Sequence, residues 1–337
     1  MRRKDQNHVC NCSNRRAFDQ FVRLKRVLLT DPIAAEGEAR LARDVEVLRA
    51  PDSDPGTILR LAREADGVIT RSKLPDDIFE AAPRVRAVVV HGTGTDLVPL
   101  AAAATHGVTV ANLPGSNAQS VAEYCVMALL MLARNIVSVV ETLKSGTWDG
   151  ARALGAGTHE IAAMTLGIVG VGEIGKRVAK ICRQGFDMRV LGHQRRLDRL
   201  PPEAEGRELH SLLRESDFVV VTCPLTPQTL HMFNRDTLAL MKPTAWLVNV
   251  GRGAVVQEQA LIEALRAKRI AGAVLDVYES YRLEPGHELF DLQNVILTPH
   301  FAGMTRESRT RMGVAAAEEM LRMLAGERPE NLVHADR

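Results

Sequence analysis

A glycine-rich stretch near the middle of the chain has the residue types and spacing of a nucleotide-binding turn. The stretch is Thr165-Leu-Gly-Ile-Val-Gly-Val-Gly-Glu-Ile-Gly175, with Gly170, Gly172 and Gly175 in Gly-x-Gly-x-x-Gly spacing. An apolar run precedes the glycines and an amphipathic run follows them, so we expect strand, turn and helix, the order that a dinucleotide site requires. The glycines would allow a tight turn, close approach of a pyrophosphate and close packing of helix on strand. The amides at the start of the helix would then face the anion.

Two further residues with chemical potential follow predicted strands. Arg252 is flanked by glycines after the apolar run 246–250, and His300 follows the run 295–297. Ligands of open α/β sheets bind at the carboxyl ends of the strands. A planar guanidinium suits a carboxylate and a neighbouring carbonyl. A histidine with a pKa near neutrality can give a proton to a carbonyl oxygen or take one back.

Alternating strands and helices must position these groups. Ahead of the glycine turn we expect strands at 26–30, 45–48, 67–70, 85–90 and 108–111, and helices at 37–43 and 57–64. From the turn onward we expect strands at 166–169, 188–191, 217–222, 245–249, 273–275 and 295–297, and helices that include 176–182 and 257–269. This alternation predicts parallel sheets covered on both faces. The fold class is therefore α/β, with two Rossmann-like, doubly wound domains.

Three other segments connect or flank these domains. The stretch 119–143 is apolar around much of its circumference, so we expect one long helix buried between surfaces. Residues 146–157 are expected to form a glycine-rich loop. A last amphipathic helix at 306–324 has no sheet left to complete in the second domain, so we expect it to return to the first.

Composition excludes several classes of protein. The 337 residues suit two domains of about 100–200 residues each. The net charge of +2 is spread along the chain, which argues against nucleic-acid binding. No apolar run reaches the roughly 20 residues of a membrane span. Five cysteines form no Cys-x-x-Cys pair, so we expect no metal and a reduced, cytoplasmic setting.

Residues 1–24 are polar and basic and lack the apolar core of a signal peptide, so we expect a tail ahead of the folded part. Cys10 and Cys12 could bind a soft metal, but no second ligand pair lies nearby in the sequence.

From residue 26 to about 330 the chain resembles the D-isomer-specific 2-hydroxyacid dehydrogenases. Four stretches carry the resemblance: His91-Gly-Thr-Gly-Thr-Asp96 leading to Asn112-Leu-Pro-Gly-Ser-Asn-Ala-Gln-Ser-Val-Ala-Glu123, the glycine turn, Val248-Asn-Val-Gly-Arg-Gly-Ala-Val-Val256, and Leu297-Thr-Pro-His-Phe-Ala-Gly303. The resemblance implies a discontinuous substrate domain, 25–118 with 304–330, and an inserted cofactor domain, 119–303. It also implies a homodimer supported by the 119–143 region.

The resemblance assigns roles to individual residues. It implies that Arg252 binds the substrate's oxo acid and that His300 is the acid/base. The implied cofactor-binding residues are Gly170, Gly172, Glu173, Ile174, Gly175, Gln194, Arg195, Arg196, Cys223, Pro224, Thr229, Val250, Gly251, Arg252, Asp276, His300, Ala302 and Gly303. The implied substrate-facing residues are Arg71, Ser72, His91, Gly92, Thr93, Gly94, Arg252 and His300. His91 either faces the cleft or caps its strand.

One catalytic position departs from the family. A carboxylate that orients the histidine usually lies five residues after the aspartate of Leu275-Asp-Val277, and here Tyr281 occupies that position. Glu279 precedes it and Glu284 follows it; we expect Glu284 to be the replacement, because family members also carry Glu-Pro there. Without a carboxylate, the imidazolium loses a partner that would raise its pKa. Formate dehydrogenases of the same superfamily use an uncharged partner, so this loss does not forbid catalysis.

The end of the second strand after the turn bears on cofactor choice. NAD enzymes place an acid there, about 20 residues past the turn, on the ribose hydroxyls. Gln194 stands at that position, and Arg195 and Arg196 follow. Arginine pairs with a 2′-phosphate that a carboxylate would repel, so we expect NADP to be preferred over NAD. The alternative is a solvated basic surface.

We therefore expect an NAD(P)-dependent oxidoreductase that interconverts a small 2-oxo acid and its D-2-hydroxy acid. Glyoxylate and hydroxypyruvate are the first substrates to test. Phosphoglycerate is another, although no regulatory domain follows residue 330. Corepressor-like members of the superfamily bind dinucleotide and assemble with partners, but the presence of Arg252 and His300 argues against that alternative. Formate or phosphite as donor is a third hypothesis; the asparagine-rich cleft motifs of formate enzymes are missing from the sequence.

Overall fold

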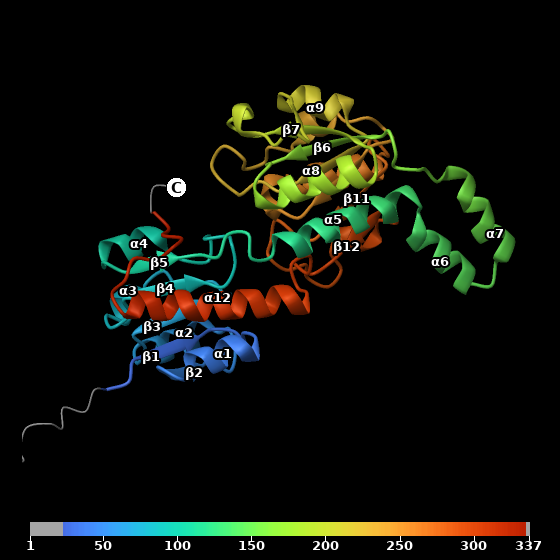
Figure 1. Cartoon of the computed structure of the whole chain (residues 1–337). Helices are drawn as coiled ribbons and strands as arrows, with labels where there is room; N and C mark the ends of the chain where they lie inside the picture. Colours follow the sequence, from blue (N-terminus) through green and yellow to red (C-terminus); the bar gives the residue numbers. More distant parts are fainter. Residues whose placement is uncertain (1–22, 335–337) are drawn as a thin grey trace, which may run out of the picture.

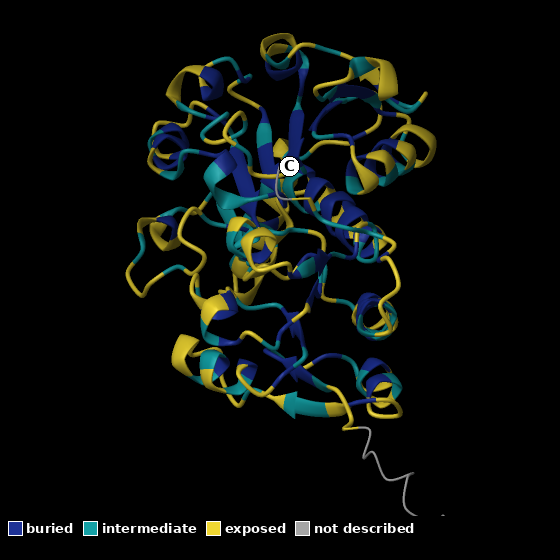
Figure 2. Cartoon of the chain, turned by 90° about the vertical axis from the view of Figure 1, so that its left-hand side faces the viewer, coloured by how far each residue is buried: buried dark blue, intermediate teal, exposed yellow. Residues whose placement is uncertain are grey.

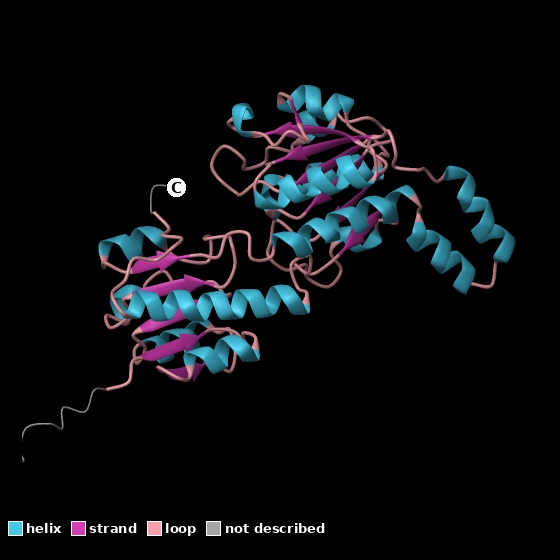
Figure 3. Cartoon of the chain, in the orientation of Figure 1, coloured by secondary structure: helices cyan, strands magenta, loops and turns pink. Residues whose placement is uncertain are grey.

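The computed structural model describes residues 23–334, which form two α/β domains (Figure 1). In each domain the strands lie between helices (Figure 3). Buried residues are concentrated in the strands and on the helix sides that face them (Figure 2). Both sheets are parallel, which confirms the fold class predicted from the alternation of elements.

The first domain contains a five-stranded sheet in the order β2-β1-β3-β4-β5. Its strands are β1 (Arg26–Leu29), β2 (Glu46–Arg49), β3 (Gly67–Thr70), β4 (Ala87–Val90) and β5 (Thr109–Ala111). Its helices are α1 (Ala35–Leu41), α2 (Pro55–Ala62), α3 (Ile78–Ala81), α4 (Leu100–Thr105) and α12 (Arg306–Leu324). The central strands β3 and β4 are buried on both faces, which is why their sequences are continuous apolar runs.

The last helix, α12, returns to this first sheet. Apolar side chains of α12, among them Met312 and Ala316, pack in one core cluster with Ile69 of β3 and Val89 of β4. The opposite face of the sheet packs against α2 and the helices beside it. The second domain is thus inserted into the first.

The second domain contains a seven-stranded sheet in the order β12-β11-β10-β9-β6-β7-β8. Its strands are β6 (Thr165–Val169), β7 (Arg189–His193), β8 (Glu205–Gly206), β9 (Phe218–Val221), β10 (Trp246–Asn249), β11 (Gly272–Leu275) and β12 (Val295–Leu297). Its helices are α5 (Ala118–Ala133), α8 (Glu173–Gly185), α9 (Leu209–Glu215), α10 (Arg235–Leu238) and α11 (Glu258–Arg266), with short 3-10 turns η2 (Leu197–Arg199), η3 (Gly253–Val255) and η4 (Glu288–Asp291).

The prediction of one long, buried helix at 119–143 is wrong in two respects, because the segment forms two helices and the second of them contains no buried residue. The segment divides into α5 and α6 (Ile136–Lys144), which are bent by 60° relative to each other. Asn135 separates them with a φ of 47°, a left-handed conformation that asparagine tolerates and a continuous helix does not. With α7 (Trp148–Ala153) and the 3-10 turn η1 (Leu154–Gly157), α6 forms an arm that projects from the second domain (Figure 1).

Two smaller predictions also differ from the structure. The segment predicted as a glycine-rich loop, 146–157, contains α7 and η1. The two-residue strand β8 was not predicted, because it has neither the length nor the apolar residues of a typical strand.

Candidate active site

The glycine turn joins β6 to α8. Gly170 has a φ of +96°, and a Cβ on it would lie 2.5 Å from the backbone nitrogen of Cys223, so only glycine fits. Gly172 is the N-cap of α8 and offers no capping side chain, while a Cβ on it would meet no atom within 4 Å. The space beside Gly172, at the start of α8 and the carboxyl edge of the sheet, is therefore open. This arrangement fits the pyrophosphate of a dinucleotide.

The other predicted cofactor residues follow the carboxyl ends of strands or begin α8. Glu173 and Ile174 lie in the first turn of α8, Cys223 and Pro224 follow β9, Val250 and Gly251 follow β10, Asp276 follows β11, and Ala302 and Gly303 follow β12. Thr229 lies further along the loop after β9, where its Oγ1 donates to the carbonyl oxygen of Pro224 at 2.7 Å. Burial raises the pKa of the Cys223 thiol to about 11, so this cysteine is a small apolar side chain and not a nucleophile.

The chain after β7 presents no carboxylate at the expected ribose position. The Nε2 of Gln194 donates to the carbonyl oxygen of Arg196 at 2.8 Å. Arg196 is paired with Asp198, with Nη2 and Oδ2 2.9 Å apart. Arg195 is exposed, and its side chain forms no ion pair within residues 23–334.

Arg252 bridges the two domains. Its Nε and Nη2 donate to Oδ1 of Asp96 at 3.1 and 3.0 Å, and its Nη1 donates to the carbonyl oxygen of Gly251 at 2.9 Å. The guanidinium lies directly over Gly94, where a Cβ would be 1.5 Å from Nη2. Gly94 was predicted as a substrate-facing backbone position, and the structure places it against Arg252. Asp96 lay in the quoted motif but was not singled out, and its position after a strand was the available signal.

His300 follows β12 on a loop held by a buried carboxylate. Its backbone N donates to the carbonyl oxygen of Asp276 at 2.8 Å, and its φ is 53°. The Asp276 side chain accepts from Thr298 Oγ1 at 2.6 Å and from the backbone nitrogens of Phe301 and Ala302 at 2.6 and 3.0 Å. The loop is thereby fixed while the His300 side chain stays accessible.

The electrostatic surroundings of His300 favour the neutral imidazole. Partial burial lowers its pKa, and the positive charge of Arg252 lowers it further. Asp276 and Asp96 act in the opposite direction but do not outweigh these effects. The two chemically predicted residues, Arg252 and His300, are thus close enough for the charge of one to act on the other.

No carboxylate partners the His300 ring within residues 23–334. Glu284, the predicted replacement, is exposed and forms no side-chain hydrogen bond with His300. Glu279 is engaged elsewhere, since its Oε1 lies 2.7 Å from Nε2 of His231. The nearest aromatic neighbour is Tyr281, whose ring lies edge-on to the imidazole with centroids 6.2 Å apart.

A buried hydroxyl chain behind the histidine loop was not predicted. The hydroxyl of Tyr124 on α5 lies 2.6 Å from Thr298 Oγ1, which in turn donates to Asp276. Tyr278 also donates to the carbonyl oxygen of Thr298, at 2.8 Å. A tyrosine directly before the apolar run 125–133 was the sequence signal for this support.

The predicted substrate-facing residues lie at the carboxyl edge of the first sheet. Arg71 and Ser72 follow β3, and His91 begins the loop after β4 that contains Gly92 and Thr93. His91 is buried, and neither ring nitrogen has a hydrogen-bond partner within the described residues. It therefore does not cap its strand through the ring.

Several other features bear on what the site is. No group of three metal-ligating side chains occurs among residues 23–334, and Cys10 and Cys12 lie outside that range. No single described helix could span a membrane by length and hydropathy.

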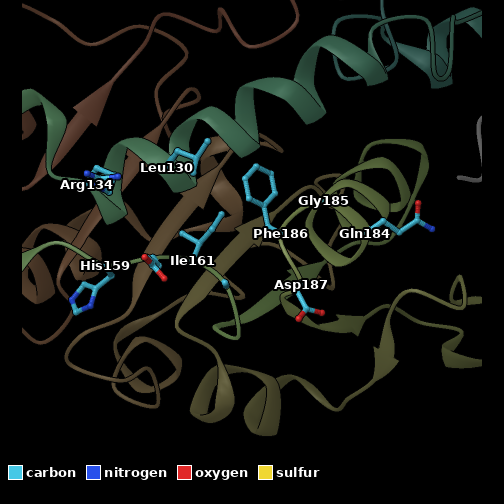
Figure 4. Close-up of a pocket in the computed structure, with 10 residues that line it drawn as sticks. Leu130, Arg134, His159, Ile161, Gln184, Gly185, Phe186 and Asp187 are labelled. Carbon is cyan, nitrogen blue, oxygen red and sulfur yellow. The ribbon is translucent and has the colours of Figure 1, made fainter.

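A hollow of about 450 Å³ is lined by Leu130, Ile161 and Phe186, among others (Figure 4). Its lining includes residues just before β6 and β7, so it lies at the amino edge of the second sheet, opposite the glycine turn.

Known proteins show the same organisation. Residues 126–302 match the family model of the D-isomer specific 2-hydroxyacid dehydrogenase NAD binding domain. A glyoxylate reductase of Aeropyrum pernix is 39% identical over 326 residues, which cover 92% of this chain and 96% of that protein. The NADPH-dependent glyoxylate/hydroxypyruvate reductase of Sinorhizobium meliloti, solved with NADP and malonate, is 28% identical and has a TM-score of 0.81. The match covers 92% of this chain and 96% of the chain of that reductase.

An NAD-dependent formate dehydrogenase of Staphylococcus aureus, solved with NAD, is 27% identical and has a TM-score of 0.83. The match covers 93% of this chain and 99% of the chain of that dehydrogenase.

The fold and the glycine turn define a two-domain dehydrogenase with a nicotinamide dinucleotide cofactor. The chain belongs to the D-isomer-specific 2-hydroxyacid dehydrogenase family and is an NAD(P)-dependent oxidoreductase.

Proposed function

We propose that the protein reduces a small 2-oxo acid to the D-2-hydroxy acid, with Arg252 binding the acid and His300 transferring the proton. The observation that carries the proposal is that Arg252 and His300 follow β10 and β12 at the carboxyl edge of one sheet, close enough for the charge of Arg252 to lower the pKa of His300. A nicotinamide dinucleotide held at the glycine turn would supply the hydride for C2 of the substrate. The proton of His300 completes the C–OH group.

The described side chains support this sequence of events. Arg252 offers a planar fork to the substrate carboxylate, for which Asp96 is the competing anion. Asp276 fixes the loop of His300, so that the imidazole is held at the edge of the sheet. Closure of the two domains would exclude water and align substrate with His300. Glyoxylate and hydroxypyruvate, named in the similar proteins, are the first substrates to test.

The test is turnover of purified protein on glyoxylate, hydroxypyruvate, phenylpyruvate and 3-phosphohydroxypyruvate with NADPH and NADH. We expect turnover to vanish in His300→Ala and to fall steeply in Arg252→Ala. His210→Ala, on the exposed side of α9, is the matched control and should behave as wild type. Cofactor binding without turnover on any oxo acid would contradict the proposal and favour a dinucleotide-sensing role.

We also propose a preference for NADP. The exposed Arg195 has no acidic partner in the described chain, and no carboxylate occupies the end of β7 to repel a 2′-phosphate. One similar structure contains NADP and another contains NAD, so the preference rests on these residues.

We further propose a homodimer formed through the arm. Helix α6 has no buried residue, and Ile136, Val137, Val140 and Leu143 on it are exposed apolar side chains. A second copy would cover this surface, which the rest of the chain leaves open. Light scattering should give twice the chain mass for the wild type and for the control Lys144→Glu. Val140→Asp with Leu143→Asp should give the mass of one chain, and a wild-type monomer would contradict the proposal.

A further inference from the structure

The carboxyl edge of the first sheet carries a pair of basic side chains that the proposed reaction does not use. The strand register sets Ile69 of β3 beside Val89 of β4, and both pack against α12. Arg71 and His91 come two residues later, each directly after the end of its strand. Because side chains alternate between the faces of a strand, Arg71 and His91 project on the face that α12 covers.

The imidazole of His91 is built into this edge without a partner. Only 5% of the residue is exposed, and both ring nitrogens lack a hydrogen bond within the described chain. Asp31, an acid whose charge acts on this ring, is already engaged, since Ser72 Oγ and Thr30 Oγ1 both donate to its Oδ2, at 2.9 and 2.7 Å. Buried polar side chains nearly always have partners, so an unpaired one calls for a water, an ion or a ligand to complete its hydrogen bonds.

Two arginines add positive charge around this ring. The guanidiniums of Arg71 and of Arg309 on α12 form no hydrogen bond or ion pair within residues 23–334. Both charges act on His91, and that of Arg71 also acts on His300. Arg71 therefore lies within electrostatic reach of both imidazoles, which connects this edge to the reacting end of the site.

Burial and the charge of Arg71 lower the pKa of His91 to about 4. The ring is thus neutral at neutral pH and retains one N–H that can donate to an anion. Among the charges that act most strongly on this ring, that of Asp31 opposes those of the two arginines.

We propose that Arg71, His91 and Arg309 form a subsite for a second carboxylate, so that the enzyme prefers 2-oxo dicarboxylic acids. The inference rests on the proposed function, in which Arg252 and His300 hold the reacting end of the same substrate. The fork of Arg71 suits a carboxylate, and the neutral N–H of His91 completes its coordination.

The kinetic test compares two acids of four carbons that differ in the second charge, oxaloacetate and 2-oxobutyrate. We expect kcat/KM to be higher for oxaloacetate in the wild type. The ratio of the two kcat/KM values should fall at least about tenfold in Arg71→Gln and in Arg309→Gln, through loss of charge-assisted contacts. Arg306→Gln removes the same charge from an exposed position of α12 and should keep the wild-type ratio.

Three kinetic outcomes would overturn the inference. They are a wild-type ratio at or below one, a ratio that neither variant changes, and a preference for 3-phosphohydroxypyruvate over oxaloacetate.

A binding measurement separates this inference from the proposed function. D-malate and D-2-hydroxybutyrate are added without nicotinamide, and the shift in Tm is recorded. We expect D-malate to raise the Tm more in the wild type and Arg306→Gln, and the excess to vanish in Arg71→Gln. This result without turnover on any oxo acid would reject the proposed function and retain the subsite. Turnover of both oxo acids with no excess shift from D-malate would reject the subsite and retain the function.

Discussion

Arg252 of the second domain donates from Nε and Nη2 to Oδ1 of Asp96 in the first domain, at 3.1 and 3.0 Å. The third nitrogen of the fork, Nη1, donates to the carbonyl oxygen of Gly251. Three of the five N–H donors of this guanidinium are therefore engaged by the protein itself, and the edge formed by Nε and Nη2 is occupied by Asp96. A substrate carboxylate that binds to this edge must share or displace Asp96, and this competition links substrate affinity to the contact between the domains.

Replacing Asp96 should tighten substrate binding. In Asp96→Asn the amide keeps its size but attracts the guanidinium less, so we expect KM for the oxo acid to fall by up to about fivefold, the worth of an exposed ion pair. Asp44→Asn, which breaks the exposed pair with Arg40, is the control and should leave KM unchanged. A rise in KM would show instead that Asp96 orients Arg252 for the substrate.

The missing carboxylate near His300 makes a prediction about pH. Reduction needs the imidazolium, which is lost as the pH rises through the pKa of His300. Burial and the charge of Arg252 lower this pKa, so kcat/KM for reduction should decline with rising pH around a midpoint below the ordinary histidine value of about 6.5. Oxidation of the hydroxy acid needs the neutral ring and should rise through the same pH.

Tyr281→Glu should restore a carboxylate beside the ring and raise the pKa of His300. The protonated form then persists to higher pH, so the decline in reduction should move upward by about 1 pH unit. Tyr281→Gln supplies a similar chain length without charge and should leave the profile near that of the wild type. An unmoved profile in Tyr281→Glu, or an equal movement in both variants, would show that position 281 does not face the imidazole.

Much of the fold could be predicted from the sequence because the apolar runs are short, regular and separated by helices. The runs at β4 and β9 are continuous because both faces of a central parallel strand are buried. The break between α5 and α6 could not be predicted from hydropathy, since apolar residues continue across Asn135. Only the backbone conformation of that asparagine separates the two helices.

The site was predictable where one residue follows one strand, as with Arg252 and His300. It was not predictable where the partner comes from the other domain, as with Asp96, because no spacing along the chain relates positions 96 and 252. The state of His91 was also inaccessible, because its burial depends on α12, which lies more than 200 residues later in the sequence. The pair of Glu279 and His231 was likewise not predictable, because the sequence does not show that their two loops lie side by side.

Asp276 should contribute stability as well as position the histidine loop. Its carboxylate accepts from Thr298, Phe301 and Ala302 and is almost fully buried. In Asp276→Asn an amide replaces one acceptor oxygen, which leaves at least one donor unpaired at a cost of about 1.5–3 kcal/mol. We expect calorimetry to show a Tm lower by several degrees. The exposed Asp76→Asn is the control, and an unchanged Tm in Asp276→Asn would contradict the role assigned to this carboxylate.

The basic residues after β7 should distinguish the two cofactors. Arg195 is exposed without an acidic partner, whereas Arg196 is paired with Asp198. Arg195→Ala should therefore raise the Kd for NADPH about tenfold or more, through loss of a charge-assisted contact with the 2′-phosphate, and leave the Kd for NADH almost unchanged. Arg196→Ala should have a smaller effect, because its guanidinium must first leave Asp198. Fluorescence titration of both cofactors measures these constants. Arg199→Ala, in the 3-10 turn that follows Arg196, is the control and should leave both constants unchanged. Equal wild-type affinity for NADPH and NADH would show that these arginines form only a solvated basic surface.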